Sequence, residues 1–452
     1  MISFLEKNQR MLLLVIAAIL AIIMGMFVSV FADFAGRRPA LLIAVPAALV
    51  VGLIFIISRK FLFSIILICR SALDPVLATT KVGAFSVGAG LNGLIILIAS
   101  LAIIRTPQPA LRYSSRLWLI VILTFFASVY FSPDKVNSFK LALNILCNAA
   151  IFTMAIVLVR SVSDYKKWIL IIFASSIIPV LYSFIDIARG GFPNPHGFRI
   201  SSTFSHPNIL AFYLVLMISI GFYIWKSKLL VEKKWLVILP VYLLVMVVLL
   251  LLTKTRSAWL GLAAFFFIYA CLYERRYLFV LIGAACVALL IPEIRDRITD
   301  LGQGNEMAAN QALNSYAWRK ELWTSGLNWM EKSHYLFGYG LGSFNYYSIT
   351  FFPLAAGKSW DSHSVYVQLM FEVGAIGFLA YILMLIRLGR KIYEVWRRNS
   401  LVYFIALLLL VEYALFSYSD NMLFYLSYNW YFWFVMGMTY SLAHIETSEV
   451  AA

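Results

Sequence analysis

Residues 235–272 read WLVILPVYLLVMVVLLLLTKTRSAWLGLAAFFFIYACL, which is two apolar runs on either side of a short polar turn. The first run has roughly the length of 20 residues that an α-helix needs to cross the hydrocarbon core of a bilayer, and the second is slightly shorter. The pattern recurs along the chain, in which 62% of the 452 residues are hydrophobic and 13% are charged. Soluble domains are about half apolar and about a quarter charged, so a bilayer must solvate this protein.

The apolar runs predict an all-α polytopic membrane protein with 12–14 transmembrane helices. The candidate spans are 11–32, 39–57, 60–78, 84–104, 116–131, 141–159, 168–187, 208–225, 235–252, 257–272, 277–291, 365–386, 401–417 and 422–442. The run 11–32 is too long for the apolar core of a signal peptide, so we expect a retained first span. The predicted units are residues 1–291, with eleven spans and motif loops near 188–207 and 253–259; a loop at 292–364; and the last three spans and C-terminus, 365–452.

The net charge of +16 is spread over short Lys/Arg clusters between the apolar runs. A nucleic-acid-binding protein would gather this charge on one soluble face, so that class of partner is excluded. If the N-terminus is inside, the inner turns contain more than half of the 37 Lys and Arg residues. The positive-inside rule therefore predicts that both termini are cytoplasmic and that the loop 292–364 lies on the other side.

The cysteines all lie in apolar runs without the spacing of metal ligands, and the sequence therefore predicts neither a disulfide nor a zinc site. We expect all four to be small core residues. They are Cys69, Cys147, Cys271 and Cys286.

Within the long loop, residues 316–331 (YAWRKELWTSGLNWME) have helical periodicity. This stretch predicts an amphipathic helix that lies in the membrane interface or caps the bundle. Arg319 falls in the middle of its apolar half, where an unpaired charge is costly. Arg319 therefore either extends its charged end to water beside a tryptophan or is directed at an anionic ligand.

Three further polar clusters are predicted on the same side of the membrane. Arg199 lies in a Gly/Pro-rich segment that ends at a helix start, and it is either a solvated hairpin arginine or part of an anion site. Lys254 and Arg256 share the tight turn at 253–259, where they either anchor to lipid headgroups or bind a ligand. His363 begins the span after the long loop, and a lone interfacial histidine is more often structural than catalytic.

The glycine-rich stretch GYGLGSF at 338–344 has no βαβ unit around it, so it does not predict a dinucleotide fold. It predicts a tight loop in which another backbone approaches closely. Taken together, arginines with one histidine and no metal ligands suit a diphosphate substrate. Guanidinium recognises phosphate bidentately, and histidine accepts a proton near neutral pH.

These motifs, in this order, resemble the O-antigen ligase and O-antigen polymerase superfamily of bacterial membrane glycosyltransferases. The resemblance covers roughly residues 195–380 and rests on GFRISSTFSHPN, TKTRSAW, the pair Trp318-Arg319, GYGLGSF and SHSVYVQLMFEVGAIGF. One position departs from it, because Ser364 stands where the superfamily often has Asn after the histidine.

The resemblance implies a GT-C-like glycosyltransferase of the bacterial inner membrane that uses no metal, no cofactor and no nucleotide-sugar donor. The donor would be a glycan on undecaprenyl diphosphate, transferred with inversion at the periplasmic face. Arg199 and Arg256 would lie near the diphosphate, and His363 would be the essential histidine. Arg319 is added to this set because it falls in the apolar half of its predicted helix. The acceptor would be lipid A core for a ligase or another lipid-linked glycan for a polymerase, and membrane lipids surround the chain.

A flippase for lipid-linked oligosaccharides is the strongest alternative outside enzymes. Transporters show repeated halves and charged or broken helices near the midplane, and this sequence shows no repeat. Arg70 and Asp74, four residues apart, are candidates for a helical ion pair, and Glu372 is an isolated acid in an apolar run.

Overall fold

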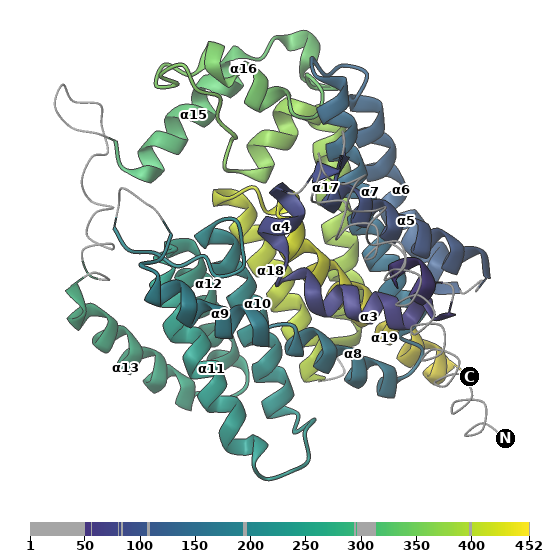
Figure 1. Cartoon of the computed structure of the whole chain (residues 1–452), viewed down its shortest axis with the longest axis vertical. Helices are drawn as coiled ribbons and strands as arrows, with labels where there is room; N and C mark the ends of the chain where they lie inside the picture. Colours follow the sequence, from purple (N-terminus) through teal and green to yellow (C-terminus); the bar gives the residue numbers. More distant parts are fainter. Residues whose placement is uncertain are drawn as a thin grey trace, which may run out of the picture.

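The computed structural model describes residues 50–451 except 56, 80, 83–84, 106–108, 193–196, 293–294, 296–312 and 397–399 (Figure 1). The predicted span 11–32, most of 39–57 and the N-terminus lie outside these residues. The predicted retained first span and the cytoplasmic N-terminus therefore stay predictions.

The described chain is helical, which confirms the predicted all-α class, with one minimal hairpin between β1 (Lys81–Val82) and β2 (Phe85–Ser86). The helices before the cap are α3 (Arg59–Arg70), α4 (Asp74–Thr79), α5 (Val87–Arg105), α6 (Pro109–Ser128), α7 (Lys135–Leu158), α8 (Val162–Ala174), α9 (Ile177–Ala188), α10 (Pro207–Lys226), α11 (Trp235–Leu252), α12 (Arg256–Leu272) and α13 (Arg276–Leu290). Then follow α15 (Ser315–Trp329), η2 (Lys332–His334), α16 (Ser343–Phe351), α17 (Val365–Trp396), α18 (Leu401–Ser419), η3 (Met422–Phe424) and α19 (Leu426–Ala451).

Seven described helices are long and apolar enough to cross a membrane, and three shorter apolar helices accompany them. The seven are Val87–Ile104, Lys135–Leu158, Val162–Ala188, Pro207–Lys226, Trp235–Leu252, Val365–Trp396 and Leu401–Ser419. The protein is therefore a polytopic all-α membrane protein. The total of 12–14 spans includes segments outside the described residues and stays a prediction.

Two predicted spans are interrupted. The segment 60–78 forms α3 and α4, separated where the Ser71 hydroxyl donates to Ser175 O at 2.9 Å. The segment 168–187 divides into α8 and α9 at Ser175 and Ser176, whose hydroxyls each donate to the carbonyl three residues earlier at 2.6 Å. Serine hydroxyls that bond locally compete with the helical backbone and bend or end helices.

The predicted span 365–386 is also not one straight helix, because α17 has a non-helical residue, Gly374, with φ 65° and ψ −173°. The break leaves backbone groups that pair with the segment 335–340. Ala375 N donates to Tyr335 O at 2.8 Å, and Tyr339 N donates to Phe371 O at 3.0 Å. A chain segment far from α17 in sequence thus passes across its kink.

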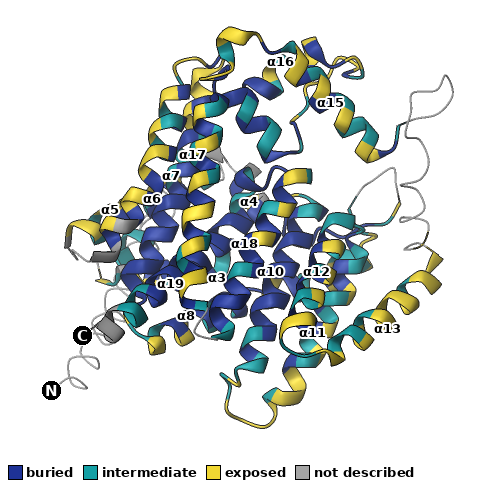
Figure 2. Cartoon of the chain, turned by 180° about the vertical axis from the view of Figure 1, so that it is seen from behind, coloured by how far each residue is buried: buried dark blue, intermediate teal, exposed yellow. Residues whose placement is uncertain are grey.

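The interior of the bundle is built from α7, α10 and α19. The spans of α10 and α7 are 89% and 78% buried, whereas only 28% of the α11 span is buried (Figure 2). The prediction that all four cysteines are core residues is wrong for Cys271 and Cys286, which are exposed on the apolar surfaces of α12 and α13. An apolar cysteine suits a lipid-facing surface as well as a core.

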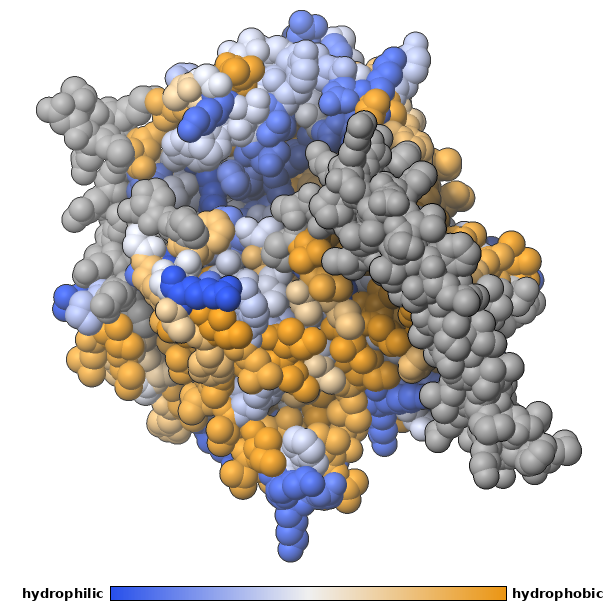
Figure 3. All heavy atoms as spheres, in the orientation of Figure 1, coloured by the Kyte–Doolittle hydropathy of each residue, from blue (hydrophilic) through white to orange (hydrophobic). Residues whose placement is uncertain are grey.

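The segment 313–362, here called the cap, contains α15, η2 and α16 and covers one end of the bundle (Figure 1). The basic turn between α10 and α11 lies at the opposite end (Figure 1). Hydrophobic side chains form a belt over the lower helices, and hydrophilic side chains gather in a recess below the cap (Figure 3). The arrangement places polar chemistry at the cap end of a lipid-embedded bundle.

Candidate functional site

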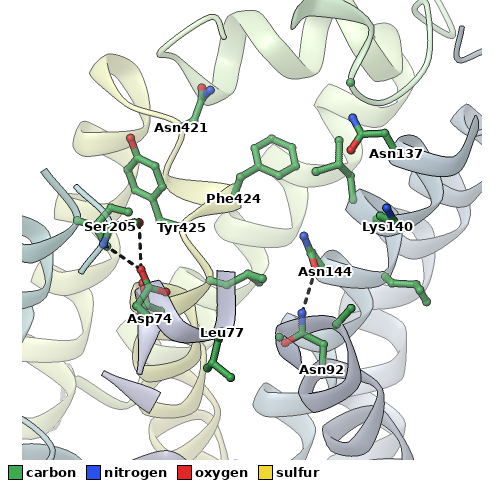
Figure 4. A pocket seen from close by; sticks show the side chains of 18 of the residues that line it. Asp74, Leu77, Asn92, Asn137, Lys140, Asn144, Ser205, Asn421, Phe424 and Tyr425 are labelled. Carbon is green, nitrogen blue, oxygen red and sulfur yellow. Dashed lines mark hydrogen bonds between the residues drawn. The ribbon is translucent and has the colours of Figure 1, made fainter. Parts of the chain in front are cut away.

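A cavity of about 790 Å³ opens below the cap, between α5, α7, the start of α10, α16 and η3 (Figure 4). His363 lines it, together with polar side chains that include Ser205, Asn421 and Tyr425. Ligand sites in proteins are typically clefts of about 300–1,000 Å³ with a few convergent polar groups. The cavity therefore has the size and composition of a substrate site.

The backbone around His363 is held in a left-handed conformation, with φ 51°. Non-glycine residues rarely adopt this conformation, and it persists only where neighbouring contacts enforce it. Trp323 Nε1 donates to Ser362 O at 2.6 Å, and the Ser362 hydroxyl donates to Ser364 O at 2.7 Å. Strain held in this way is common at functional sites and aims the imidazole at a fixed place.

His363 is neutral near pH 7, because the protein lowers the pKa of its imidazole from 6.5 to about 4. Burial is the largest cause, and the positive charge of Arg319 and the neighbouring His206 add to it. Both burial and positive neighbours disfavour the protonated form. A neutral imidazole can accept a proton, which is the state a general base requires.

His206 was not singled out by the sequence analysis, yet it belongs to the same cluster. The pKa of its imidazole is lowered to about 4, chiefly by burial and then by the positive charges of Arg199 and Arg319. Its Nδ1 accepts a hydrogen bond from Asn208 N at 3.1 Å and so caps α10. The sequence signal was the stretch His206-Pro207-Asn208, in which a cap residue precedes Pro at the first helical position.

Arg199 is buried, with 8% of its surface exposed, and its guanidinium joins three segments. Nε donates to Thr253 O at 2.7 Å, and Nη2 donates to Asn208 Oδ1 at 2.8 Å. The reading of Arg199 as a solvated hairpin arginine is therefore wrong. The planar fork of guanidinium fixes the start of α10 against the turn between α11 and α12.

Behind this arginine lies Asp420, which is 1% exposed and which sequence analysis also missed. Asn208 Nδ2 donates to Asp420 Oδ1 at 3.2 Å, and the Tyr425 hydroxyl donates to the same oxygen at 2.8 Å. Burial raises the pKa of the Asp420 carboxyl, while Arg319 and Arg199 act in the opposite direction. Asp420 thus interacts electrostatically with both arginines, and its hydrogen bonds hold Asn208 and Tyr425 in place beside them.

Arg319 is half-buried on α15, and its charge acts on His363, His206 and Asp420 alike. Within the described part of the chain, no carboxylate lies within 4.0 Å of its guanidinium. A partly buried guanidinium of this kind suits an anionic ligand. The structure thus brings Arg319, Arg199 and His363 to one place.

Arg256 stands apart from this group. Its Nη2 donates to the Ser315 hydroxyl at 2.8 Å, which links the first turn of α12 to the first turn of α15. Like Arg199 and Arg319 it does not line the cavity with His363, and unlike them it is not among the charges that act on His363, His206 or Asp420. Arg256 therefore connects the cap to the bundle, and its contact with diphosphate stays a prediction.

The glycine stretch 338–344 forms the close backbone approach that its sequence predicts. Gly338, Gly340 and Gly342 have φ values of 69°, 93° and 77°. A Cβ on Gly340 would lie 2.3 Å from Ser132 N, and the Ser132 hydroxyl donates to Leu341 O at 2.9 Å. Only glycine fits here, where the cap is seated against the turn after α6.

The charges that suggested a transporter have local partners. Arg70 Nη1 and Asp74 Oδ1 form the predicted ion pair at 3.0 Å, and the Ser205 hydroxyl donates to Asp74 Oδ2 at 3.1 Å (Figure 4). Glu372 is buried and accepts hydrogen bonds from Gln368 Nε2 at 3.1 Å and Phe344 N at 3.4 Å. Both acids lie beside the cavity and position its walls.

A cofactor or metal has few candidate ligands here. Among the residues that the structure describes, no three His, Cys, Asp or Glu side chains are grouped so that they could hold a metal ion. Metal independence of the reaction stays a prediction.

Comparison with known families gives a match over residues 241–382 to the model described as O-antigen ligase. The match begins in α11 and ends in α17 beyond the kink, so it contains Arg256, Arg319 and His363 but not Arg199. None of the curated proteins matches the chain. The match covers the helices and cap that build one side of the cavity, and with the ordered motifs it supports the resemblance of this membrane protein to the O-antigen ligase and polymerase superfamily.

Proposed function

We propose that the protein is an O-antigen ligase-type glycosyltransferase, which transfers a glycan from undecaprenyl diphosphate to a hydroxyl of lipid A core. The observation that carries the proposal is the cluster at the cavity. A neutral histidine, His363, lies in the field of Arg319, and Arg199 lies behind Asn208 at the same end of the bundle. This is the arrangement that a reaction with a proton to accept and a diphosphate to release requires.

In this mechanism the acceptor hydroxyl attacks the anomeric carbon of the donor glycan, and His363 takes its proton. The bond between that carbon and the diphosphate oxygen breaks, and the anomeric configuration inverts. Arg199, Arg256 and Arg319 stabilise the negative charge that grows on the leaving diphosphate. Guanidinium groups thereby supply the charge that a metal ion supplies in other phosphate-releasing enzymes.

The low pKa of His363 fits this mechanism. In the unliganded protein, burial and then the positive charge of Arg319 lower the pKa of the imidazole and so make it a weak base. A bound diphosphate carries negative charge that offsets the arginine, so the basicity of His363 rises when the donor is in place. Proton transfer is then favoured in the complex over the empty enzyme.

The proposal also includes orientation: the cap faces the periplasm, both termini are cytoplasmic, and the protein lies in a bacterial inner membrane. The supports are the Lys/Arg asymmetry and the position of the basic turn between α10 and α11 at the end opposite the cap (Figure 1).

A polymerase of the same superfamily would use the same cavity with a lipid-linked repeat as acceptor. A deletion strain separates the two. Accumulation of long undecaprenyl-linked polymer supports the ligase, whereas accumulation of single lipid-linked repeat units contradicts it and supports the polymerase. Normal surface glycan in the deletion strain contradicts both.

A further inference from the structure

The cavity has a second polar wall, formed by α7 on the side away from Ser205 and Tyr425 (Figure 4). Asn137, Lys140 and Asn144 are three and four residues apart, so they lie on one face of the helix. All three line the cavity, and they are called the α7 wall below. In a membrane helix, residues at this spacing usually form an apolar stripe. In α7 they carry two carboxamides and an ammonium group.

The amide of Asn144 is held in a fixed orientation. Asn92 Nδ2, on α5, donates to Asn144 Oδ1 at 3.1 Å (Figure 4). Within the described residues, Asn144 Nδ2 has no protein acceptor in hydrogen-bonding range, and this nitrogen lies at the cavity. A carboxamide with one end fixed and the other directed at a cavity is a preorganised ligand group.

Lys140 is the residue of the α7 wall that points most clearly to a ligand. It lies in the second turn of a helix that crosses the membrane, and no Asp or Glu in the described part of the chain lies within 4.0 Å of its ammonium group. Because Lys140 lines the cavity without a carboxylate partner, its ammonium group can donate hydrogen bonds to a ligand there. Lys135, one turn earlier, differs: its ammonium lies 5.6 Å from the centre of the Tyr130 ring, and it does not line the cavity.

We propose that the α7 wall binds the sugar residues of a glycan substrate; this inference rests on the proposed function. Sugar hydroxyls both donate and accept hydrogen bonds, and carboxamides can do the same with their two ends. Phe424 lies in the middle of the cavity between the α7 wall and Tyr425 and offers an apolar surface to the C–H face of a sugar ring (Figure 4). A lipid chain gains nothing from a wall of amides, because it cannot form hydrogen bonds with them.

In this proposal the arginines and the α7 wall bind different parts of the substrate. The diphosphate lies toward Arg199 and Arg319, which stand outside the lining of the cavity, and the α7 wall holds the sugar rings inside it. The sugars belong either to the donor, next to its diphosphate, or to the acceptor. The two sources share the same hydrogen-bonding chemistry and are separated by the experiment.

The test uses the full chain in lipid nanodiscs and two substitutions, Lys140→Met and Asn144→Leu, with Lys135→Met as the matched control. The probes are undecaprenyl diphosphate without sugar, the undecaprenyl-diphosphate-linked glycan extracted from the source cells, and the acceptor in a transfer assay. Lys140→Met keeps the test valid if Asn144→Leu fails to fold, because Lys140 is exposed.

We expect both substitutions to leave the affinity for sugar-free undecaprenyl diphosphate unchanged. Loss of one hydrogen bond to a sugar should weaken binding about 10-fold. If affinity for the lipid-linked glycan falls, the α7 wall binds donor sugars; if only the KM for the acceptor rises, it binds acceptor sugars. Lys135→Met should change neither.

The inference is overturned if the wild type transfers glycan and both variants match it in donor affinity and acceptor KM. Equal loss of affinity for the sugar-free lipid also contradicts it, because the wall would then act on the diphosphate. A wild type that binds neither undecaprenyl probe and transfers nothing contradicts the proposed function itself, and this inference with it.

Discussion

Replacing Arg199 with Lys keeps the positive charge but should impair the enzyme. The guanidinium bridges Thr253 O and Asn208 Oδ1 through two different nitrogens, at 2.7 and 2.8 Å. The single nitrogen of lysine cannot occupy both places, so at least one hydrogen bond from a charged donor is lost, which costs roughly 1.5–3 kcal/mol. Both acceptors are protein groups, so this cost falls on the arrangement of the site. Since 1.4 kcal/mol corresponds to a factor of ten, we expect transfer to fall by at most about 100-fold.

The assay compares purified Arg199→Lys, wild type and Arg189→Lys in nanodiscs, for donor affinity and for initial transfer rate. Arg189 is the matched control because it lies in the same segment, is exposed, and its Nη1 donates to the Tyr182 hydroxyl at 3.2 Å. Rates are measured well below the melting temperature of each variant, so that unfolding is not taken for loss of binding. Wild-type rate and donor affinity in Arg199→Lys would refute the reasoning.

The remaining predictions concern pH, topology, metal and the cap. Activity should be lost as pH falls through the pKa of His363, about 4, because protonated imidazole cannot act as a base. Arg319→Gln removes a neighbouring positive charge, so the acidic limb of the pH profile of kcat/KM should move to higher pH. The midpoint of this limb should stay below pH 6.5, because His363 is still buried. A limb that stays in place or moves to lower pH contradicts the electrostatic account. A cysteine introduced at Lys332, which is exposed in the cap, should react with a membrane-impermeant thiol reagent in intact spheroplasts; labelling only after lysis would reverse the topology. Transfer should continue in EDTA, and loss of activity that magnesium or manganese restores would count against metal independence. Gly340→Ala should reduce the yield of folded protein, because its Cβ would lie 2.3 Å from Ser132 N, and an unchanged melting temperature would show that the loop can shift.

The spans with charged or polar ends were predictable from the sequence. The run 235–252 is α11, and the run 257–272 is α12 within one residue, because each ends at charged residues that cannot enter the hydrocarbon core. The kink at Gly374 was not predictable in this way. It lies inside an apolar run, and its cause is a set of backbone hydrogen bonds to residues 335–340, which local pattern does not reveal.

In the candidate site, too, some residues were predictable from the sequence and others were not. His363 and Arg199 stand out as polar residues at the edges of apolar runs, and Arg319 stands out as a charge in the apolar half of a predicted amphipathic helix. Asp420 also lies between two predicted spans, but its importance comes from Asn208, which is far from it in sequence and 3.2 Å away in the fold. The α7 wall could have been found, since its three polar residues repeat at helical spacing at the start of an apolar run.

Reconstituted transfer with a His363→Ala variant tests the central claim most directly. Purified wild type in nanodiscs should move glycan from undecaprenyl diphosphate to lipid A core. His363→Ala should bind the donor normally and transfer roughly 10²–10⁴-fold more slowly, as expected for loss of a general base. Full transfer by a folded His363→Ala variant would contradict the account and leave His363 as a structural residue at the start of α17.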